Sequence, residues 1–214
     1  MPQLIQHIPI QSDGVPNPQT LAPILSAAQP GTVTLVASNA YNDSELTQTL
    51  LTLSLELAKT QPTIFVSNQY TKREFQCRIA AAALDVTPDE VHALLKTNPQ
   101  RVTEKLDAAS KTAISFAIPL RPEDYNGALF PSGGACLIDV AQILAETGRS
   151  EKDSAEWMSE QAKAHNAAVI AGLYLFARSD DPNAPIPGVM KVDRLFIKNA
   201  DAIFVLHDED ERRR

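Results

Sequence analysis

The chain has 214 residues, 44% of them hydrophobic and 21% charged, with a formal net charge of −7 and a pI near 5.1. This length and composition indicate one soluble globular domain. The negative charge excludes a broad basic surface for nucleic acid, because phosphate neutralisation by Lys and Arg supplies most of the non-specific affinity. Only a local basic strip is compatible with it.

The start of the chain, "MPQLIQHIPIQSDG", has neither the charged region nor the long apolar core of a signal peptide. No apolar run in the sequence reaches the roughly 18 residues of a membrane span. Cys77 and Cys136 lie far apart in apolar surroundings, which favours buried free thiols in a reducing compartment over a disulfide or a metal pair. We therefore expect a cytoplasmic protein without membrane contact.

Residues 1–27 are rich in Pro, Gln and Ser, and they predict an extended lead-in with one helical turn around "PQTLAPILSAA". A single domain is expected over residues 28–210, followed by a solvated tail at residues 211–214. Apolar segments predict the strands, at residues 32–37, 62–67, 112–118, 135–140, 167–176 and 202–206.

Helical patterns separate these strands. Asp43 or Ser44 suits a helix cap, and the leucines that follow mark one helical face: Leu46, Leu50, Leu53 and Leu57. Capping boxes begin two later helices, at Thr71 with Glu74 and at Thr87 with Glu90. Near-continuous apolar strands that alternate with amphipathic helices predict an α/β fold with a mostly parallel central sheet and helices on both faces.

The stretch "VTLVASNAYNDSELTQTLLTL" has the strand, turn and helix of a phosphate-binding loop. Such a loop needs glycines to wrap the phosphates, a lysine to pair with them and a hydroxyl to ligate magnesium. Ser38–Glu45 contains neither glycine nor a basic residue. Asp43 and Glu45 instead complement the helix dipole, and each would repel a phosphate by on the order of 4 kcal/mol at about 4 Å.

Over about residues 28–210 the chain resembles the RecA-like motor domain of DnaB-type replicative helicases. "QPGTVTLVAS" is similar to the lead into the family's Walker A loop, and the same register places Asp43, Ser44 and Glu45 at its Gly, Lys and Thr. "FVSNQY" is similar to the strand that carries the catalytic glutamate, with Gln69 at that position. Because a glutamine cannot take a proton from water, the general base is missing as well.

The Walker B region gives the closest match. "CLIDVAQIL" resembles the family pattern, with Asp139 as the magnesium-orienting aspartate and Gln142 as the family's glutamine. "GRSE" follows at the matching distance. In the later strands, Leu173 and Tyr174 replace a Ser-Gln pair, and Asp208 stands where an arginine is expected.

The resemblance implies a RecA-like P-loop NTPase fold, and the substitutions point to a pseudo-ATPase with no cofactor, ATP and magnesium included. Its vestigial nucleotide site would comprise Asn42, Asp43, Ser44, Glu45, Gln69, Asp139 and Gln142. Asp139 is then better explained as a strand-end residue that caps a neighbouring loop than as a metal ligand. Such a protein would bind a replication or recombination protein such as a helicase, or assemble with itself.

Two further functional classes stay open. The segment "RSDDPNAPIPGVMK" matches the family's DNA-touching loops, and its terminal Arg178 and Lys191 make it a candidate contact of a single-stranded DNA-binding accessory module. Its adjacent aspartates and the absence of an aromatic residue weaken that interpretation. An enzyme, either a weak ATPase that retains nucleotide binding or one of another kind, is the third class, although the four histidines show no metal spacing.

Overall fold

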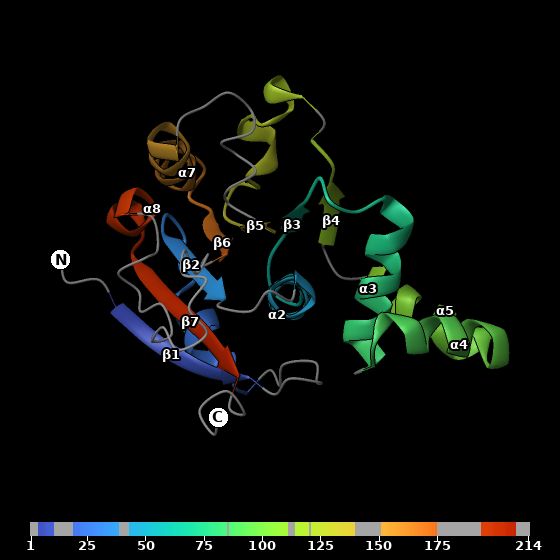
Figure 1. The fold of residues 1–214 in the computed structure, drawn as a ribbon. Coiled ribbons are helices and arrows are strands. Elements are labelled where there is room, and N and C mark those ends of the chain that lie inside the picture. Colours follow the sequence, from blue (N-terminus) through green and yellow to red (C-terminus); the bar gives the residue numbers. More distant parts are fainter. Residues whose placement is uncertain are drawn as a thin grey trace.

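The computed structural model describes residues 4–10, 19–38, 43–84, 86–110, 114–119, 121–139, 151–174 and 194–208. Across these residues a seven-stranded sheet runs in the order β1-β7-β2-β6-β5-β3-β4, and every pairing is parallel (Figure 1). The strands are β1 (Leu4–Ile10), β2 (Val33–Ser38), β3 (Thr63–Val66), β4 (Ile114–Ala117), β5 (Ala135–Ile138), β6 (Ala168–Tyr174) and β7 (Ala202–Asp208). The predicted α/β class is confirmed.

Helices cover both faces of this sheet. They are α1 (Ala22–Ala27), α2 (Asp43–Ala58), α3 (Lys72–Leu84), α4 (Pro88–Thr97), α5 (Pro99–Ser110), α7 (Glu151–His165) and α8 (Arg194–Asn199), with 3-10 turns η1 (Pro122–Asp124) and η2 (Gly127–Leu129). The chain crosses the sheet in one direction from β1 to β4 and returns through β5 to β7. Because parallel crossovers are right-handed, the two halves place their helices on opposite faces.

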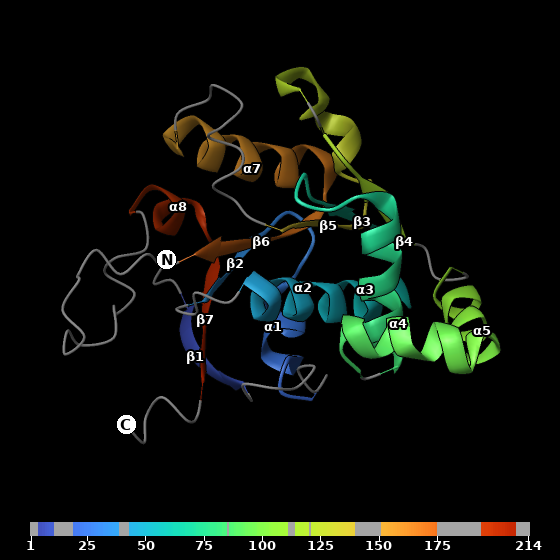
Figure 2. The ribbon, with the colours of Figure 1, turned by 45° about the vertical axis from the view of Figure 1, so that its right-hand side comes forward.

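The hydrophobic core accordingly has two layers. One contains buried residues of α1, α2 and α3 against the sheet, with Leu50 and Phe65 among them. The other contains residues of α7, α8 and η2 on the opposite face, with Met158 and Phe196 among them. Figure 2 shows α7 and α8 on one side of the strands and α1 and α2 on the other.

A third, small cluster joins the end of α3 to α4 and α5, through Ala81, Val91 and Val102. These helices extend beyond the β3 and β4 side of the sheet (Figure 1). Both predicted capping boxes are confirmed here, because Thr71 and Glu74 exchange hydrogen bonds at the start of α3 and Thr87 and Glu90 do so at the start of α4.

The N-terminal segment differs from the expected lead-in. Leu4–Ile10 are extended, but they pair with β7 in register and form the edge strand of the sheet. Ile8 is buried in the α1 and α2 layer. Pro9 interrupts the alternation of apolar and polar residues in this segment. An edge strand tolerates a proline because the backbone on its outer side forms no hydrogen bonds with a neighbouring strand.

The helix α2 also differs from the amphipathic expectation. The four predicted leucines are buried, as their spacing requires, but so is every residue from Leu46 to Ser54 around the whole helix. Thr47, Thr49 and Ser54 are fully buried. A hydrogen-bond partner offsets the cost of burying a polar side chain, and Thr47 has one in Asp139.

Candidate functional site at the carboxyl edge of the sheet

Asp139 lies directly after β5, where the carboxyl ends of the parallel strands meet. Its side chain is fully buried, with 0% exposed. Its backbone N–H donates to the carbonyl of Val66 at the end of β3, over 2.9 Å. The neighbouring β6 approaches closely because residue 172 is glycine, and a Cβ there would lie 2.1 Å from the Asp139 carbonyl oxygen. The backbone of the aspartate is therefore tightly positioned.

Two hydroxyl groups bind the carboxylate of Asp139. Thr47 Oγ1, from α2, donates to Oδ1 over 2.7 Å. Ser67 Oγ, which follows β3, donates to Oδ2 over 2.9 Å. Hydrogen bonds to a carboxylate are stronger than those between neutral groups. Asp139 thus joins α2, β3 and β5 with both of its oxygens engaged.

The turn after β3 continues from this contact. Ser67 Oγ also accepts from the Gln69 backbone N–H, over 3.1 Å. The side chains of Asn68 and Gln69 are exposed. Gln69, predicted at the position of the general base, therefore reaches the site through its backbone and the Ser67 hydroxyl.

Tyr70 lies beside Thr47, and Arg78 lies over the Tyr70 ring. The Tyr70 hydroxyl lies 3.4 Å from Thr47 Oγ1. The Arg78 guanidinium carbon, from α3, lies 4.3 Å from the centroid of the Tyr70 ring. The ring is half-buried. A cation at this distance above an aromatic face is electrostatically attracted to it.

The other predicted site residues divide into two groups. Asp43, Ser44 and Glu45 form the first turn of α2, where carboxylates suit the helix dipole, and the structure describes their backbone alone. Asn42, Gln142, Arg178 and Lys191 lie outside the described residues. Asp139 and the Gln69 turn are thus the predicted elements that the structure brings together.

Sequence reasoning missed Thr47 and Ser67. The ungapped register placed Glu45 at the hydroxyl position of the phosphate loop, whereas the hydroxyl that contacts Asp139 belongs to Thr47, two residues later. With that shift the lysine position falls on Leu46, which is fully buried. The sequence signal for this contact is Thr47, a threonine directly after Leu46, the first of the core-facing leucines of α2. The lysine position is occupied by Ser44 in the ungapped register and by Leu46 in the shifted one. Neither side chain carries a positive charge.

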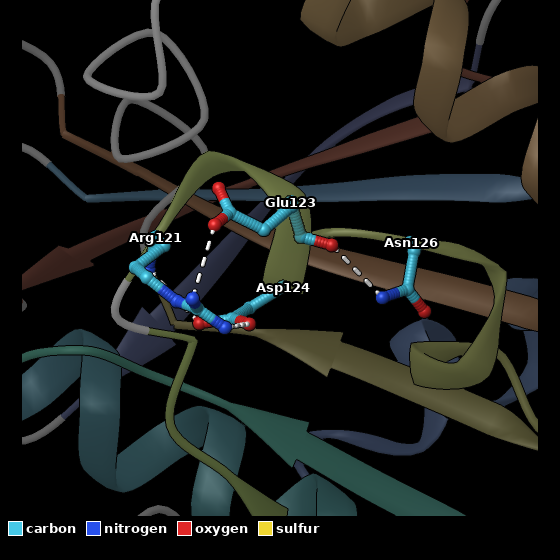
Figure 3. A network of polar contacts seen from close by, with 4 residues as sticks. All are labelled: Arg121, Glu123, Asp124 and Asn126. Carbon is cyan, nitrogen blue, oxygen red and sulfur yellow. Dashed lines mark hydrogen bonds and ion pairs between the residues drawn. The ribbon is translucent and has the colours of Figure 1, made fainter.

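The segment of the chain that connects β4 to β5 contains a second polar network (Figure 3). Arg121 contacts Glu123 and Asp124, each over 3.2 Å, and the amide of Asn126 donates to the Glu123 carbonyl over 3.0 Å. Arg121 and Glu123 are largely exposed, so these ion pairs add little to stability. The network shapes the 3-10 turns that lead into β5.

The described segments contain no group of three or more His, Cys, Asp or Glu side chains arranged to hold a metal ion. Both cysteines are free, and burial raises the pKa of the Cys136 thiol far above its usual range. Among the helices that the structure describes, none is long and apolar enough to cross a membrane.

Comparison with known proteins identifies the fold. No protein-family model and no curated protein matches the chain. A solved DnaB-like replicative helicase, described with its interactions with primase, matches with a TM-score of 0.65 and 16% identity over 86% of this chain, which spans 49% of that helicase. A second solved structure, of an ATPase domain, matches with a TM-score of 0.68 and 16% identity, over 86% of this chain and 72% of that one. The chain has the RecA-like fold of these helicase ATPase domains, as predicted.

Proposed function

We propose that this chain is a catalytically inactive pseudo-ATPase that acts as a binding or regulatory protein in DNA replication or recombination. The observation that supports this function best is the residue at the lysine position, which is Ser44 or the fully buried Leu46 and carries no positive charge. In such a site the buried Asp139, which accepts from Thr47 and Ser67, serves as a structural tie between α2, β3 and β5.

The chemistry of the surrounding positions agrees with inactivity. Phosphoryl transfer in P-loop NTPases depends on a lysine at the phosphates. Ser44 or Leu46 occupies the lysine position, and the glutamine side chain of residue 69 cannot act as a base. Asp43 and Glu45 add negative charge at the start of α2, where a polyphosphate would otherwise benefit from the helix dipole.

The partner that we propose is a replication or recombination protein such as a helicase. The support is the shared fold, together with the interaction with primase that is described for the DnaB-like helicase. Assembly with itself is the second option for the same surfaces. Affinity capture with the full chain should recover replication or recombination proteins. A strictly monomeric bait that captures none of them would contradict the proposal.

Inactivity is tested by phosphate release from Mg-ATP, with and without single-stranded DNA. We expect the rate of the buffer alone. Wild type and Asp139→Asn should be indistinguishable, since neither supplies the missing lysine or base. Phosphate release by the wild type that Asp139→Asn abolishes would overturn the proposal.

A second candidate function is binding of magnesium nucleotide without hydrolysis. The contact that favours it is Thr47 Oγ1 to Asp139 Oδ1, at 2.7 Å, since a threonine and an aspartate together hold magnesium in P-loop NTPases. Thermal unfolding separates the two functions. A ligand at 100 times its Kd stabilises a protein by about 2.7 kcal/mol. An increase in Tm with Mg-ATP that disappears in Thr47→Val would select the nucleotide-binding function.

A further inference from the structure

We infer that Tyr70 is a latch that holds the turn between β3 and α3, Ser67–Thr71, closed against α2 beside Asp139. The inference deepens the proposed function, because it rests on Asp139 acting as a structural tie. Two contacts among the described residues attach the turn to the site. Ser67 bonds Asp139 directly, and Tyr70 reaches it through Thr47.

The direction of these hydrogen bonds follows from the number of protons. Thr47 has one hydroxyl hydrogen, and an ionised carboxylate can only accept, so this hydrogen goes to Asp139. In the contact between the two hydroxyls, at 3.4 Å, Tyr70 is then the donor and Thr47 Oγ1 the acceptor. The result is a chain from Tyr70 through Thr47 to Asp139, in which each hydrogen bond polarises the next.

Arg78 contacts the face of the Tyr70 ring and stabilises its position. Its guanidinium carbon lies 4.3 Å from the centroid of the Tyr70 ring. Glu74, one turn earlier on α3, accepts from the Thr71 N–H over 2.7 Å and interacts electrostatically with Arg78. Glu74 therefore interacts with both the start of α3 and Arg78, and Arg78 contacts the Tyr70 ring. These interactions orient the Tyr70 hydroxyl toward Thr47.

The latch couples an exposed surface to a buried site. Asn68 and Gln69 lie exposed between the two attachment points, Ser67 and Tyr70. Asn68 and Gln69 belong to the same short turn as Tyr70, so a displacement of this turn away from α2 breaks the contact of Tyr70 with Thr47.

Hydrogen exchange with mass spectrometry on the full chain tests the latch. Tyr70→Phe keeps the ring under Arg78 and removes the hydroxyl alone. We expect exchange in a peptide that covers residues 66–71 to become about threefold to tenfold faster, which corresponds to the loss of one hydrogen bond. Arg78→Gln should accelerate it about twofold to fivefold, through loss of the cation–π contact.

The matched control is Arg73→Gln, an exposed position on the same helix, which should leave the turn unchanged. A peptide that covers β7 reports global opening and should not respond to Tyr70→Phe. The latch is refuted if the turn exchanges in Tyr70→Phe as in wild type, or if β7 accelerates equally. Phosphate release from Mg-ATP by the wild type would overturn the proposed pseudo-ATPase function and leave the latch intact, since the exchange comparison is made without nucleotide.

Discussion

A buried carboxylate needs hydrogen-bond donors, and Asp139 takes them from Thr47 and Ser67. Each donor comes from a different element, so the aspartate holds α2 and the end of β3 against β5. Removal of one donor leaves a buried charge partly unsatisfied, which is costly in a low-dielectric interior. The hydrogen bonds of Asp139 to Thr47 and Ser67 therefore stabilise the folded state.

Thr47→Val and Thr47→Ser separate the hydroxyl from the methyl group. Valine has nearly the shape of threonine but no donor, and we expect a loss of about 1.5–3 kcal/mol in the free energy of unfolding. Serine keeps the donor and loses one methyl group, at a cost of about 0.8 kcal/mol. Urea unfolding measures both. Equal losses in the two variants would show that the bond to Asp139 contributes nothing.

At the scale of elements, the starts of α3 and α4 follow local rules that the sequence displays. Each capping box uses residues three positions apart, so no distant contact is needed to form it. The backbone N–H and the hydroxyl of Thr87 both donate to Glu90 and lower its pKa, and Thr71 does the same for Glu74.

This lowered pKa predicts a dependence of stability on pH. A carboxyl group whose pKa is depressed on folding stabilises the protein above its unfolded pKa of about 4.3, and the contribution is lost as pH falls through the folded value. Glu90→Gln keeps an acceptor but cannot titrate. The difference in urea midpoint between wild type and Glu90→Gln should therefore shrink below about pH 4.3.

A difference that stays constant from neutral pH down to pH 3 would contradict the role of the Glu90 charge. Because Glu90 is exposed, the effect is expected to be small, and comparison at matched ionic strength is the appropriate control.

At the scale of the whole molecule, β1 closes one edge of the sheet. It pairs with β7 over its full length, from Leu4 with Ala202 to Ile10 with Asp208. Deletion of residues 1–10 should expose the edge of β7 and lower stability by at least about 1.5–3 kcal/mol, the value of burying Ile8 alone. Thermal unfolding measures the loss. Deletion of residues 211–214, which the sequence predicts to be a solvated tail, is the control and should leave the Tm unchanged.

The types of the elements and most of the sheet can be predicted from the amino-acid sequence alone. The strands β2 to β7 follow from apolar runs, and the starts of α3 and α4 follow from capping boxes, because both signals depend on residues close together in the chain. The predicted cap at Asp43 or Ser44 is wrong, since both residues lie inside α2. The resemblance of "CLIDVAQIL" to a Walker B segment likewise predicted Asp139 as a site residue. Position 69 was also placed near the site, because the turn that carries it follows β3 directly.

The surroundings of Asp139 and the position of β1 depend on contacts between residues far apart in the chain. Thr47 and Asp139 are 92 positions apart, and their contact depends on how α2 packs against the ends of β3 and β5. The pairing of β1 with β7 joins opposite ends of the chain, whose proximity no local pattern encodes. Local signals specify elements, whereas the partner of a buried polar group is specified by packing in three dimensions.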